Sequence, residues 1–162
     1  MENKKVIEAL KKTFLEKVSE VPDRLGDSVV RIEKDVLFKI MEFLKNRPCE
    51  FTMLLDLTCV DYLSSKGCFE MVYHLFSISS NKRIRIKSEV RKNELDIDSL
   101  SDLWKNANWL EREIFDMFGI NFKGHPDMRR LFMYEGFEGY PLCKDYPLRK
   151  RQPKIPLRKI TK

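Results

Sequence analysis

The sequence predicts an α+β fold, a two-layer sandwich with helices on one face of a mainly antiparallel sheet, followed by an extended C-terminal arm. Segments of helical periodicity come first, three strand-like segments joined by short links come next, and glycines and prolines interrupt everything after residue 118. A chain of 162 residues suits one such domain. We expect the sandwich over residues 1–118 and a docking arm, not an independent domain, over residues 119–162.

The N-terminal part begins with an amphipathic helix predicted over residues 4–19, which should end before Pro22. A short strand over residues 28–33 should follow. Asp35 can then cap a second helix, which Pro48 closes. The two helices carry apolar residues at spacings of three and four, namely Val6, Ile7, Leu10, Phe14 and Val18 in the first and Val36, Leu37, Ile40, Met41 and Leu44 in the second.

Three strands are predicted over residues 51–63, 68–77 and 82–91, and the links between them are short enough for an antiparallel meander. The beginning of the first, residues 51–55, could also form a helical turn. In the third strand apolar and basic residues alternate, with Ile84, Ile86 and Val90 on one side and Arg83, Arg85 and Lys87 on the other. One face of the sheet should therefore be exposed to solvent.

Two helix starts follow the meander. Ser99 with Asp102 three residues later predicts a short helix through Trp104. Asn108 and Glu111 repeat this capping pattern for a helix over residues 109–118. Gly119 can end that helix in the left-handed conformation.

Composition narrows the class of protein. Hydrophobic residues make up 43% of the chain and charged residues 35%, and no apolar run reaches the roughly 18 residues that cross a bilayer. The N-terminus carries acidic residues and no arginine in its first twenty positions, unlike a transit peptide, and is expected to be a mature one. We expect the chain to reach a membrane only through a partner.

The distribution of charge and the cysteine content argue against a basic body and against a metal site. The net charge of +6 comes from the C-terminal end, where eight Lys or Arg residues stand against Asp145 alone from Lys144 onward. The body is nearly neutral. Four cysteines without a C-x-x-C pair, and only two histidines, make an iron–sulfur or zinc site improbable, and reduced core thiols are expected instead.

Residues 108–148 concentrate charge and aromatic rings without a recognisable catalytic set. Arg112 and Asp116 are four apart and can pair, while Glu113 and Asp116 are predicted to share a helix face. An acid–base carboxylate pair is conceivable, but exposed ion pairs are the stronger interpretation. Glu111 and Glu113 also suit the positive first turn of the helix.

The following segment contains His125, Asp127, Arg129 and Arg130. We expect His125 to act as a neutral hydrogen-bonding group or as a partner for Asp127 rather than as a metal ligand. The adjacent arginines should point to opposite sides of an extended backbone. One can then hold the segment to its own domain, while the other reaches a carboxylate on a neighbour.

The aromatic and basic residues further along could stack on single-stranded nucleic acid, but the prolines favour an extended peptide that docks on protein. No G-x-G-x-x-G or phosphate-binding loop is present, and no cysteine or serine has a neighbouring histidine to activate it. Redox chemistry would have to reside on another chain.

These residues resemble the 30 kDa subunit family of respiratory complex I, the C subunit of NADH:quinone oxidoreductase. The resemblance is carried by the runs ERE at 111–113, DMFG at 116–119, GHPD at 124–127, RR at 129–130 and GFEGYPLCKDYPL at 136–148. A weaker resemblance covers residues 56–62, 72–77 and 83–87. Cys143 departs from the family, which usually has arginine there, so that an interface charge is lost or supplied by Lys144.

The resemblance implies a cofactor-free subunit of the peripheral arm that positions its neighbours for assembly. FMN, iron–sulfur clusters, NADH and quinone would be bound by other subunits, and this chain would lie against the quinone-site 49 kDa-type subunit and the iron–sulfur subunits. It would sit on the cytoplasmic side of the cell membrane, or the matrix side if organelle-encoded. The interface residues it implies are Glu111, Arg112, Glu113, Asp116, His125, Asp127, Arg129, Arg130, Phe137, Tyr140, Lys144, Asp145 and Tyr146.

Two alternatives remain open at this level. Related family members serve ferredoxin- or F420H2-oxidising complexes and membrane-bound hydrogenases, so the electron donor is set elsewhere. A basic-tailed nucleic-acid-binding module, or a stand-alone enzyme that depends on Glu113, would be the rival outside the family.

Overall fold

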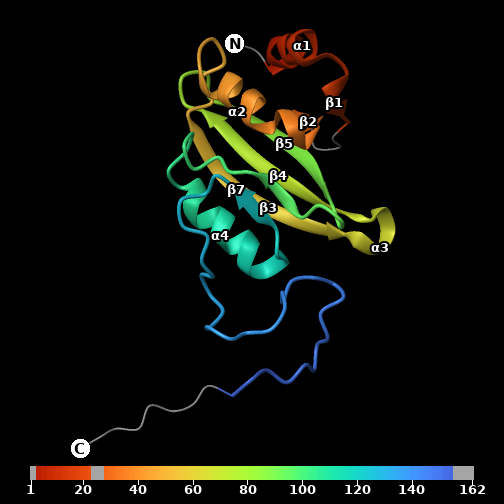
Figure 1. Ribbon diagram of the computed structural model, residues 1–162. Coiled ribbons are helices and arrows are strands. Elements are labelled where there is room, and N and C mark those ends of the chain that lie inside the picture. Colours follow the sequence, from red (N-terminus) through yellow and green to blue (C-terminus); the bar gives the residue numbers. More distant parts are fainter. Residues whose placement is uncertain (1–2, 23–27, 155–162) are drawn as a thin grey trace, which may run out of the picture.

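A five-stranded sheet forms the centre of the computed structural model, which describes residues 3–22 and 28–154 (Figure 1). The strand order is β1-β2-β5-β4-β3, and every neighbouring pair is antiparallel except β2 and β5. The strands are β1 (Val18–Val21), β2 (Val29–Ile32), β3 (Met53–Tyr62), β4 (Cys68–Ser77) and β5 (Lys82–Arg91).

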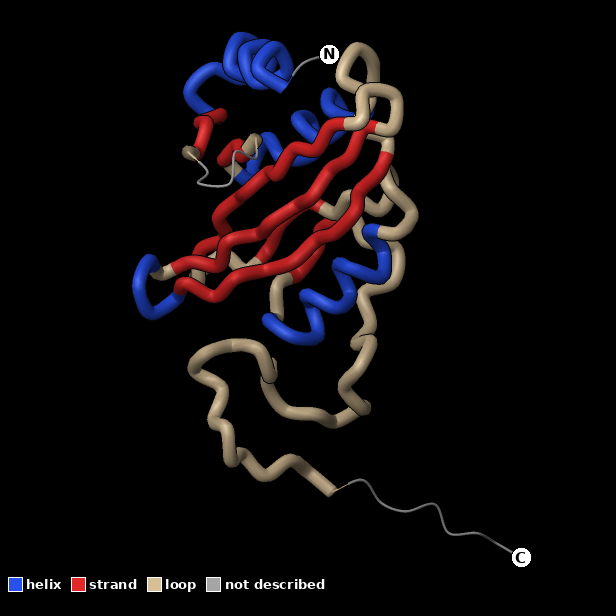
Figure 2. The backbone as a smooth tube through the Cα atoms, turned by 180° about the vertical axis from the view of Figure 1, so that it is seen from behind, coloured by secondary structure: helices blue, strands red, loops and turns tan. Residues whose placement is uncertain are grey.

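Three helices pack on one face of this sheet, α1 (Asn3–Phe14), α2 (Leu37–Lys45) and α4 (Ala107–Phe118). Their buried side chains join those of the sheet in one core; Phe69 of β4 meets Phe118 of α4 edge to face, with ring centroids 6.0 Å apart. Seen from behind, the strands lie in front of α2, and α1 lies above the sheet (Figure 2). The α+β sandwich with helices on one face is thus confirmed.

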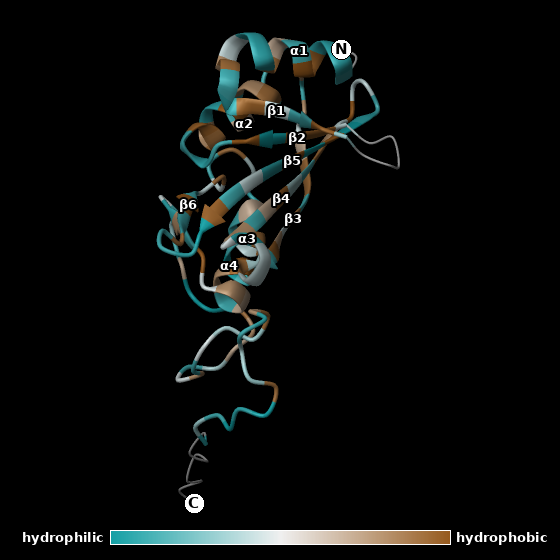
Figure 3. Cartoon of the chain, turned by 90° about the vertical axis from the view of Figure 1, so that its right-hand side faces the viewer, coloured by the Kyte–Doolittle hydropathy of each residue, from teal (hydrophilic) through white to brown (hydrophobic). Residues whose placement is uncertain are grey.

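The meander agrees closely with its prediction. β4 and β5 have the predicted bounds, and β3 runs as a strand from Met53 rather than starting as a helical turn. The link between β3 and β4 forms one short helix, α3 (Leu63–Lys66). Along β5 the apolar residues are buried and the basic ones are exposed or half-buried, as expected from their alternation. Figure 3 colours the chain by the hydropathy of each residue.

The first helix is shorter than predicted. It ends at Phe14, and Leu15 has a φ of 50°, which leads into the 3₁₀ turn η1 (Leu15–Lys17). Val18 belongs to β1 instead of to the helix, where it pairs with Ile32 and is buried. Sheet pairing of this apolar residue outweighs the helical spacing that includes it.

The N-terminus of the second helix, α2, differs from the prediction, because Asp35 does not cap it. Asp35 lies in the 3₁₀ turn η2 (Lys34–Val36) and makes no capping hydrogen bond; its carboxylate accepts one from Lys17 instead. The helix itself ends at Lys45, before Pro48. Its predicted apolar stripe is buried, apart from half-buried Val36.

The predicted helix over residues 99–104 is a single turn, in which the amide groups of Leu103 and Trp104 donate to the Leu100 carbonyl. Neither Asn108 nor Glu111 caps α4, since α4 begins at Ala107 and Asn108 lies inside it. Gly119 does end the helix, with a φ of 80°. That conformation suits glycine because a Cβ would be strained there.

Regular structure continues past Gly119, which the sequence did not predict. Strand β7 (Asn121–Lys123) pairs in parallel with β6 (Asp96–Asp98), and Ile120 and Phe122 are buried beside it. Two apolar residues in a run of three were too short a signal for a strand. The packed core therefore includes residues up to 123.

The cysteines are free thiols, as expected, with Cys49, Cys59 and Cys68 buried and Cys143 half-buried. Within the described ranges, no helix is both long and apolar enough to cross a membrane.

Candidate functional site

The arm is held to the domain by the carboxylate of Asp116, near the end of α4. This side chain is fully buried, and its Oδ2 accepts hydrogen bonds from the amides of Leu131 (3.1 Å), Phe132 (2.7 Å) and Met133 (2.8 Å). Its Oδ1 accepts one from Nη1 of Arg130 at 2.9 Å. A buried carboxylate is tolerated only when its oxygens are satisfied in this way. We call the contacts of Asp116 with residues 130–133 the Asp116 hub.

Arg130 extends the Asp116 hub to a more distant part of the arm. Both of its Nη atoms also face the Gly139 carbonyl, at 3.3 and 3.4 Å. Its guanidinium lies 5.8 Å from the ring centre of Phe137 and 5.4 Å from that of Tyr140. Such cation–π contacts are favourable when the cation is partly removed from water, and the Arg130 side chain is 25% exposed.

Arg112 does not form the predicted pair with Asp116. It donates from Nε to the Arg129 carbonyl at 3.0 Å and from Nη2 to the Arg130 carbonyl at 3.3 Å, while lying 5.0 Å from the ring centre of Trp109. Asp116 points into the protein because the arm supplies amide donors there. Arg112 thus binds the backbone of the same segment from outside.

Glu113 is exposed whereas Asp116 is buried, so the two carboxylates do not share a face. The conceivable acid–base pair is therefore not formed. The interpretation as ordinary exposed ion pairs is also wrong, because Asp116 is a buried structural group.

His125 acts as the neutral hydrogen-bonding group that was expected. Its Nδ1 accepts from the Asp127 amide at 3.0 Å, so the proton resides on Nε2, which donates to the Asn108 carbonyl at 3.1 Å. Asp127 instead makes a two-point ion pair with Arg129, at 2.7 and 2.6 Å. Arg129 is 75% exposed and Arg130 points inward, so the adjacent arginines do face opposite sides.

The arm returns to the end of α4 through Tyr140. A Cβ on Gly119 would lie 2.5 Å from the Tyr140 ring, so only glycine allows this close approach. Next to it, the Leu142 amide donates to the Met117 carbonyl at 3.1 Å. Gly119 therefore both ends the helix and receives the arm.

One further contact joins the arm to the sheet. The carboxylate of Asp61, at the end of β3, is 4% exposed and accepts from the Lys144 amide at 2.8 Å and from the Leu63 amide at 2.8 Å. Beside it, the Cys143 thiol points at the Phe118 carbonyl at 3.5 Å, and burial raises its pKa to about 11. A packed thiol thus occupies the position where the resemblance implies an arginine.

The outer part of the arm is stabilised by its own aromatic rings. Phe137 stacks on Tyr146 with centroids 6.2 Å apart and meets Tyr134 edge to face at 5.7 Å. Gln152 bonds to both the amide and the carbonyl of Glu138, at 2.9 and 3.0 Å. Gln152 thus ties residues 149–154 to the rest of the arm, and residues 155–162 lie outside the described ranges.

Glu111 is buried inside the domain, away from the arm. Its carboxylate accepts from Ser99 Oγ and from the Leu100 amide, both at 2.6 Å, and so holds the turn after β6 against α4. Removal from water raises the Glu111 pKa to about 7, although these two hydrogen bonds oppose the rise. The sequence suggested a helix-capping role; the structure gives it a cross-linking one.

Several apolar side chains next to the Asp116 hub are exposed, and the sequence reasoning did not select them as site residues. Trp109 is 59% exposed, Phe132 60% and Leu142 55%. The sequence analysis chose the nearby Arg112 and Arg130 instead, for their charge. Whether an aromatic ring in this segment is exposed depends on the tertiary structure. The apolar run Leu131–Met133 after the two arginines was the one signal in the sequence for exposed apolar groups here.

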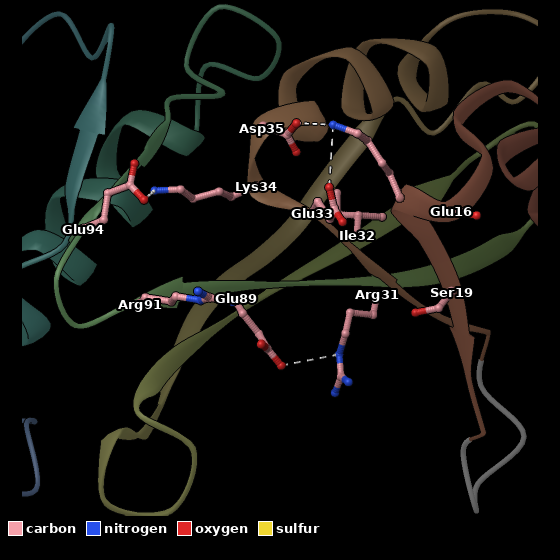
Figure 4. Close-up of a pocket in the computed structure, with 11 residues that line it drawn as sticks. Glu16, Ser19, Arg31, Ile32, Glu33, Lys34, Asp35, Glu89, Arg91 and Glu94 are labelled. Carbon is pink, nitrogen blue, oxygen red and sulfur yellow. Dashed lines mark hydrogen bonds and ion pairs between the residues drawn. The ribbon is translucent and has the colours of Figure 1, made fainter.

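A hollow of about 530 Å³ lies beside β1, β2 and β5, and several of its charged side chains form ion pairs with one another (Figure 4). Lys17 pairs with Glu33 at 3.6 Å and with Asp35, Arg31 with Glu89 at 3.8 Å, and Lys34 with Glu94 at 2.9 Å. Among the residues that the structure describes, no group of three or more His, Cys, Asp or Glu side chains is placed to hold a metal.

Comparison with known proteins shows the family of the chain. Residues 30–152 match the family model described as respiratory-chain NADH dehydrogenase, 30 Kd subunit. The chain is 40% identical to the C subunit of the NADH-quinone oxidoreductase of Geotalea uraniireducens, over 91% of this chain and 89% of that one.

Two solved structures are similar. A trypsin-resistant fragment of Nqo5 superposes with a TM-score of 0.66 at 29% identity, covering 74% of this chain and 96% of the fragment. A chain of an archaeal respiratory membrane complex, the membrane-bound sulfane sulfur reductase, superposes with a TM-score of 0.74, covering 90% of this chain and 85% of that chain. At 21% identity it shows the fold alone.

Replacement of Asp116 by asparagine should release the arm. The substitution removes the charge and turns an amide group toward Arg130, so we expect a loss of about 3 kcal/mol in unfolding free energy and faster tryptic cleavage between residues 129 and 150. Urea denaturation and timed proteolysis measure these effects. Asp127→Asn, which affects only an exposed pair, is the control and should change neither; equal effects of both variants would contradict the role of the hub.

Replacement of Gly119 by alanine should be more harmful than replacement of Gly124, although both have a φ near 80°. The backbone strain is shared, at about 1 kcal/mol, but only at position 119 does the new Cβ meet the Tyr140 ring. We expect an additional loss of about 1–2 kcal/mol in Gly119→Ala, measured by thermal or urea unfolding. Equal losses in the two variants would show that Tyr140 is not docked there.

Glu111 should make stability fall as pH rises. Because its pKa is raised in the folded state, the folded chain binds more protons than the unfolded one between about pH 4.5 and 7. The unfolding free energy should fall by about 3 kcal/mol across that range from this group alone. The difference between wild type and Glu111→Gln, measured by urea unfolding at several pH values, should follow this course. Exposed Glu113→Gln is the control; a constant difference for Glu111→Gln would contradict the raised pKa.

Proposed function

This chain belongs to the 30 kDa subunit family of the respiratory-chain NADH dehydrogenase, and we propose that it is the cofactor-free, non-catalytic subunit that positions its neighbours in the peripheral arm of such a complex. As a member of this family it is a subunit of an NADH-quinone oxidoreductase and works together with other subunits.

One observation carries the proposal: the arm is fixed by buried contacts on its inner side while its outer side presents aromatic and charged groups. The Asp116 hub, the Gly119–Tyr140 contact and the Asp61–Lys144 bond all lie on the inner side. A pre-organised segment loses less conformational entropy on docking than a flexible one.

The groups available to a partner are those that the domain does not use. Trp109 and Phe132 are large, exposed and close to the fixed backbone, which is typical of the anchors that contribute most to binding energy. Arg129 is exposed and can exchange Asp127 for a partner carboxylate. Glu113 and Asp145 are exposed and suit the rim of an interface. Arg112, Asp116 and Arg130 support the interface from within.

The chemistry of the site supports a structural role. Of the two carboxylates considered as an acid–base pair, Asp116 is buried and engaged with backbone amides, while Glu113 is exposed and apart from it. Glu111 is engaged with Ser99 and Leu100. In our proposal FMN, iron–sulfur clusters, NADH and quinone are bound by other subunits, and loss of this chain stops electron transfer indirectly.

We assign the neighbours by family. The quinone-site 49 kDa-type subunit and the iron–sulfur subunits are the proposed partners, and the cytoplasmic side of the cell membrane, or the matrix side in an organelle, is the proposed location. The fold shared with a chain of an archaeal respiratory membrane complex also supports a second candidate, the equivalent subunit of a related complex with another electron donor. Co-purified subunits identified by mass spectrometry distinguish the two.

Removal of residues 124–162 should leave a folded domain that no longer joins the complex. The cut follows β7, so the core and the β6–β7 pair are retained. Circular dichroism should show a folded domain, while affinity purification of the truncated chain should yield no peripheral-arm subunits.

A full-length double variant, Trp109→Ser with Phe132→Ser, separates docking from folding. Both side chains are exposed, so stability should be unchanged while the yield of assembled complex falls at least about tenfold. Exposed Ile78→Ser is the matched control. Normal assembly of both the truncated chain and the double variant would refute the proposed role of the arm.

A further inference from the structure

The face of the sheet opposite the helices has no covering element among the described residues (Figures 1 and 2). The register places side chains from all five strands on it. They are Ser19 and Val21 of β1, Val29 and Arg31 of β2, Met53, Asp56, Thr58, Val60 and Tyr62 of β3, Cys68, Glu70, Val72, His74 and Phe76 of β4, and Arg83, Arg85, Lys87, Glu89 and Arg91 of β5. We call this surface the open face.

At the centre of the open face, Glu70 is 3% exposed although no helix covers it. Its carboxylate is bonded to Lys87 at 2.7 Å and to Arg31 at 3.4 Å, and Arg31 also approaches Glu89 at 3.8 Å. Their side chains lie across the sheet and shield the carboxylate. These charged groups are therefore already fixed and partly desolvated, which lowers the cost of burying them beneath a partner.

The edge of the open face nearest the start of β5 is hollowed and basic. Arg83, Arg85, His74 and Asp56 line a hollow of about 340 Å³ there, together with Ser28. The guanidinium of Arg83 lies 5.9 Å from the ring centre of Phe76. A guanidinium in such a setting can form two parallel hydrogen bonds with a carboxylate.

The open face combines arginine with aromatic side chains, two residue classes that are enriched at protein interfaces. Its five cations outnumber its three carboxylates, so its net charge is positive. The open face also continues into the arm, because the Lys144 ammonium lies 5.9 Å from the ring centre of Tyr62. A partner seated on the arm could thus extend over the sheet.

We propose that the open face is a second interface, which receives an acidic and partly apolar surface of another subunit of the same complex. The inference rests on the proposed function for the nature of the partner. Charge complementarity selects the occupant: a carboxylate would reach the hollow at Arg83, and apolar groups would cover Val60 and Phe76. Glu70 would remain within its own ion pairs and keep Arg31 and Lys87 in place.

Hydroxyl-radical footprinting of the isolated full chain and of the purified complex tests this directly. Oxidation of Tyr62, His74 and Phe76 should fall at least about fivefold on assembly, as expected for residues buried in an interface core. Ile78, on the hairpin between β4 and β5 and 63% exposed, reports the general level of reactivity. Unchanged oxidation of His74 and Phe76 in the complex would overturn the inference.

The same experiment keeps the two interfaces apart. Protection of Trp109 and Phe132 without protection of the open face would support the arm as an interface and overturn this inference alone. Protection of the open face without protection of Trp109 and Phe132 would support this inference and contradict the arm as an interface. A membrane surface or a nucleic acid could also bind a basic face, so vesicles of phosphatidylglycerol and a single-stranded oligonucleotide are each added to the isolated chain. If either probe protects the open face from oxidation while assembly of the complex does not, the inference is overturned.

A charge reversal checks the chemistry of the partner. Arg83→Glu, at an exposed position, should reduce incorporation into the complex at least about tenfold with no change in the stability of the isolated chain. Arg83→Lys should retain more of it than Arg83→Glu. Arg47→Glu, on a 91% exposed side chain outside the open face, is the control. Full incorporation of Arg83→Glu would overturn the assignment of an acidic partner.

Discussion

The arrangement of the C-terminal third depends on the carboxylate of Asp116. A fully buried carboxylate needs all of its oxygen sites satisfied, and here three consecutive amides and one arginine satisfy them. The dependence is mutual. Without the arm, the helix would carry a charged group without its partners, and without the helix, the amides of residues 131–133 would lose the carboxylate that they bind. The arm is therefore a part of the domain surface, although it contains no core of its own.

This constraint gives a segment with little regular structure a fixed conformation, which the proposed docking role requires. Its backbone is fixed from inside by Asp116 and from outside by Arg112, and its return path is fixed by the contact of Tyr140 with Gly119. What remains for a partner is a set of exposed aromatic rings on a rigid base. The open face offers a second surface with arginine and aromatic residues, and in our proposal it is covered by another subunit.

Periodicity and turn chemistry made much of the fold predictable. β4 and β5 have the predicted bounds because alternating apolar residues face a core that only one face of the sheet has. The second helix buries its predicted stripe, and Gly119 ends α4 as a glycine in that place should. The motifs of residues 111–148 identified the family to which the chain belongs.

The sequence by itself determined the fold class, the meander, the buried stripe of α2 and the aromatic, basic character of the arm, because these follow from local spacing and composition. Only the tertiary structure decided the partner of Asp116, the burial of Glu111 and the exposure of Trp109. The capping and i,i+4 patterns at Glu111, Arg112 and Asp116 were real but were outweighed, since a buried carboxylate gains more from donors on distant segments than from an exposed neighbour on its own helix. Such donors are brought together by chain folding, and their distance along the sequence carries no signal.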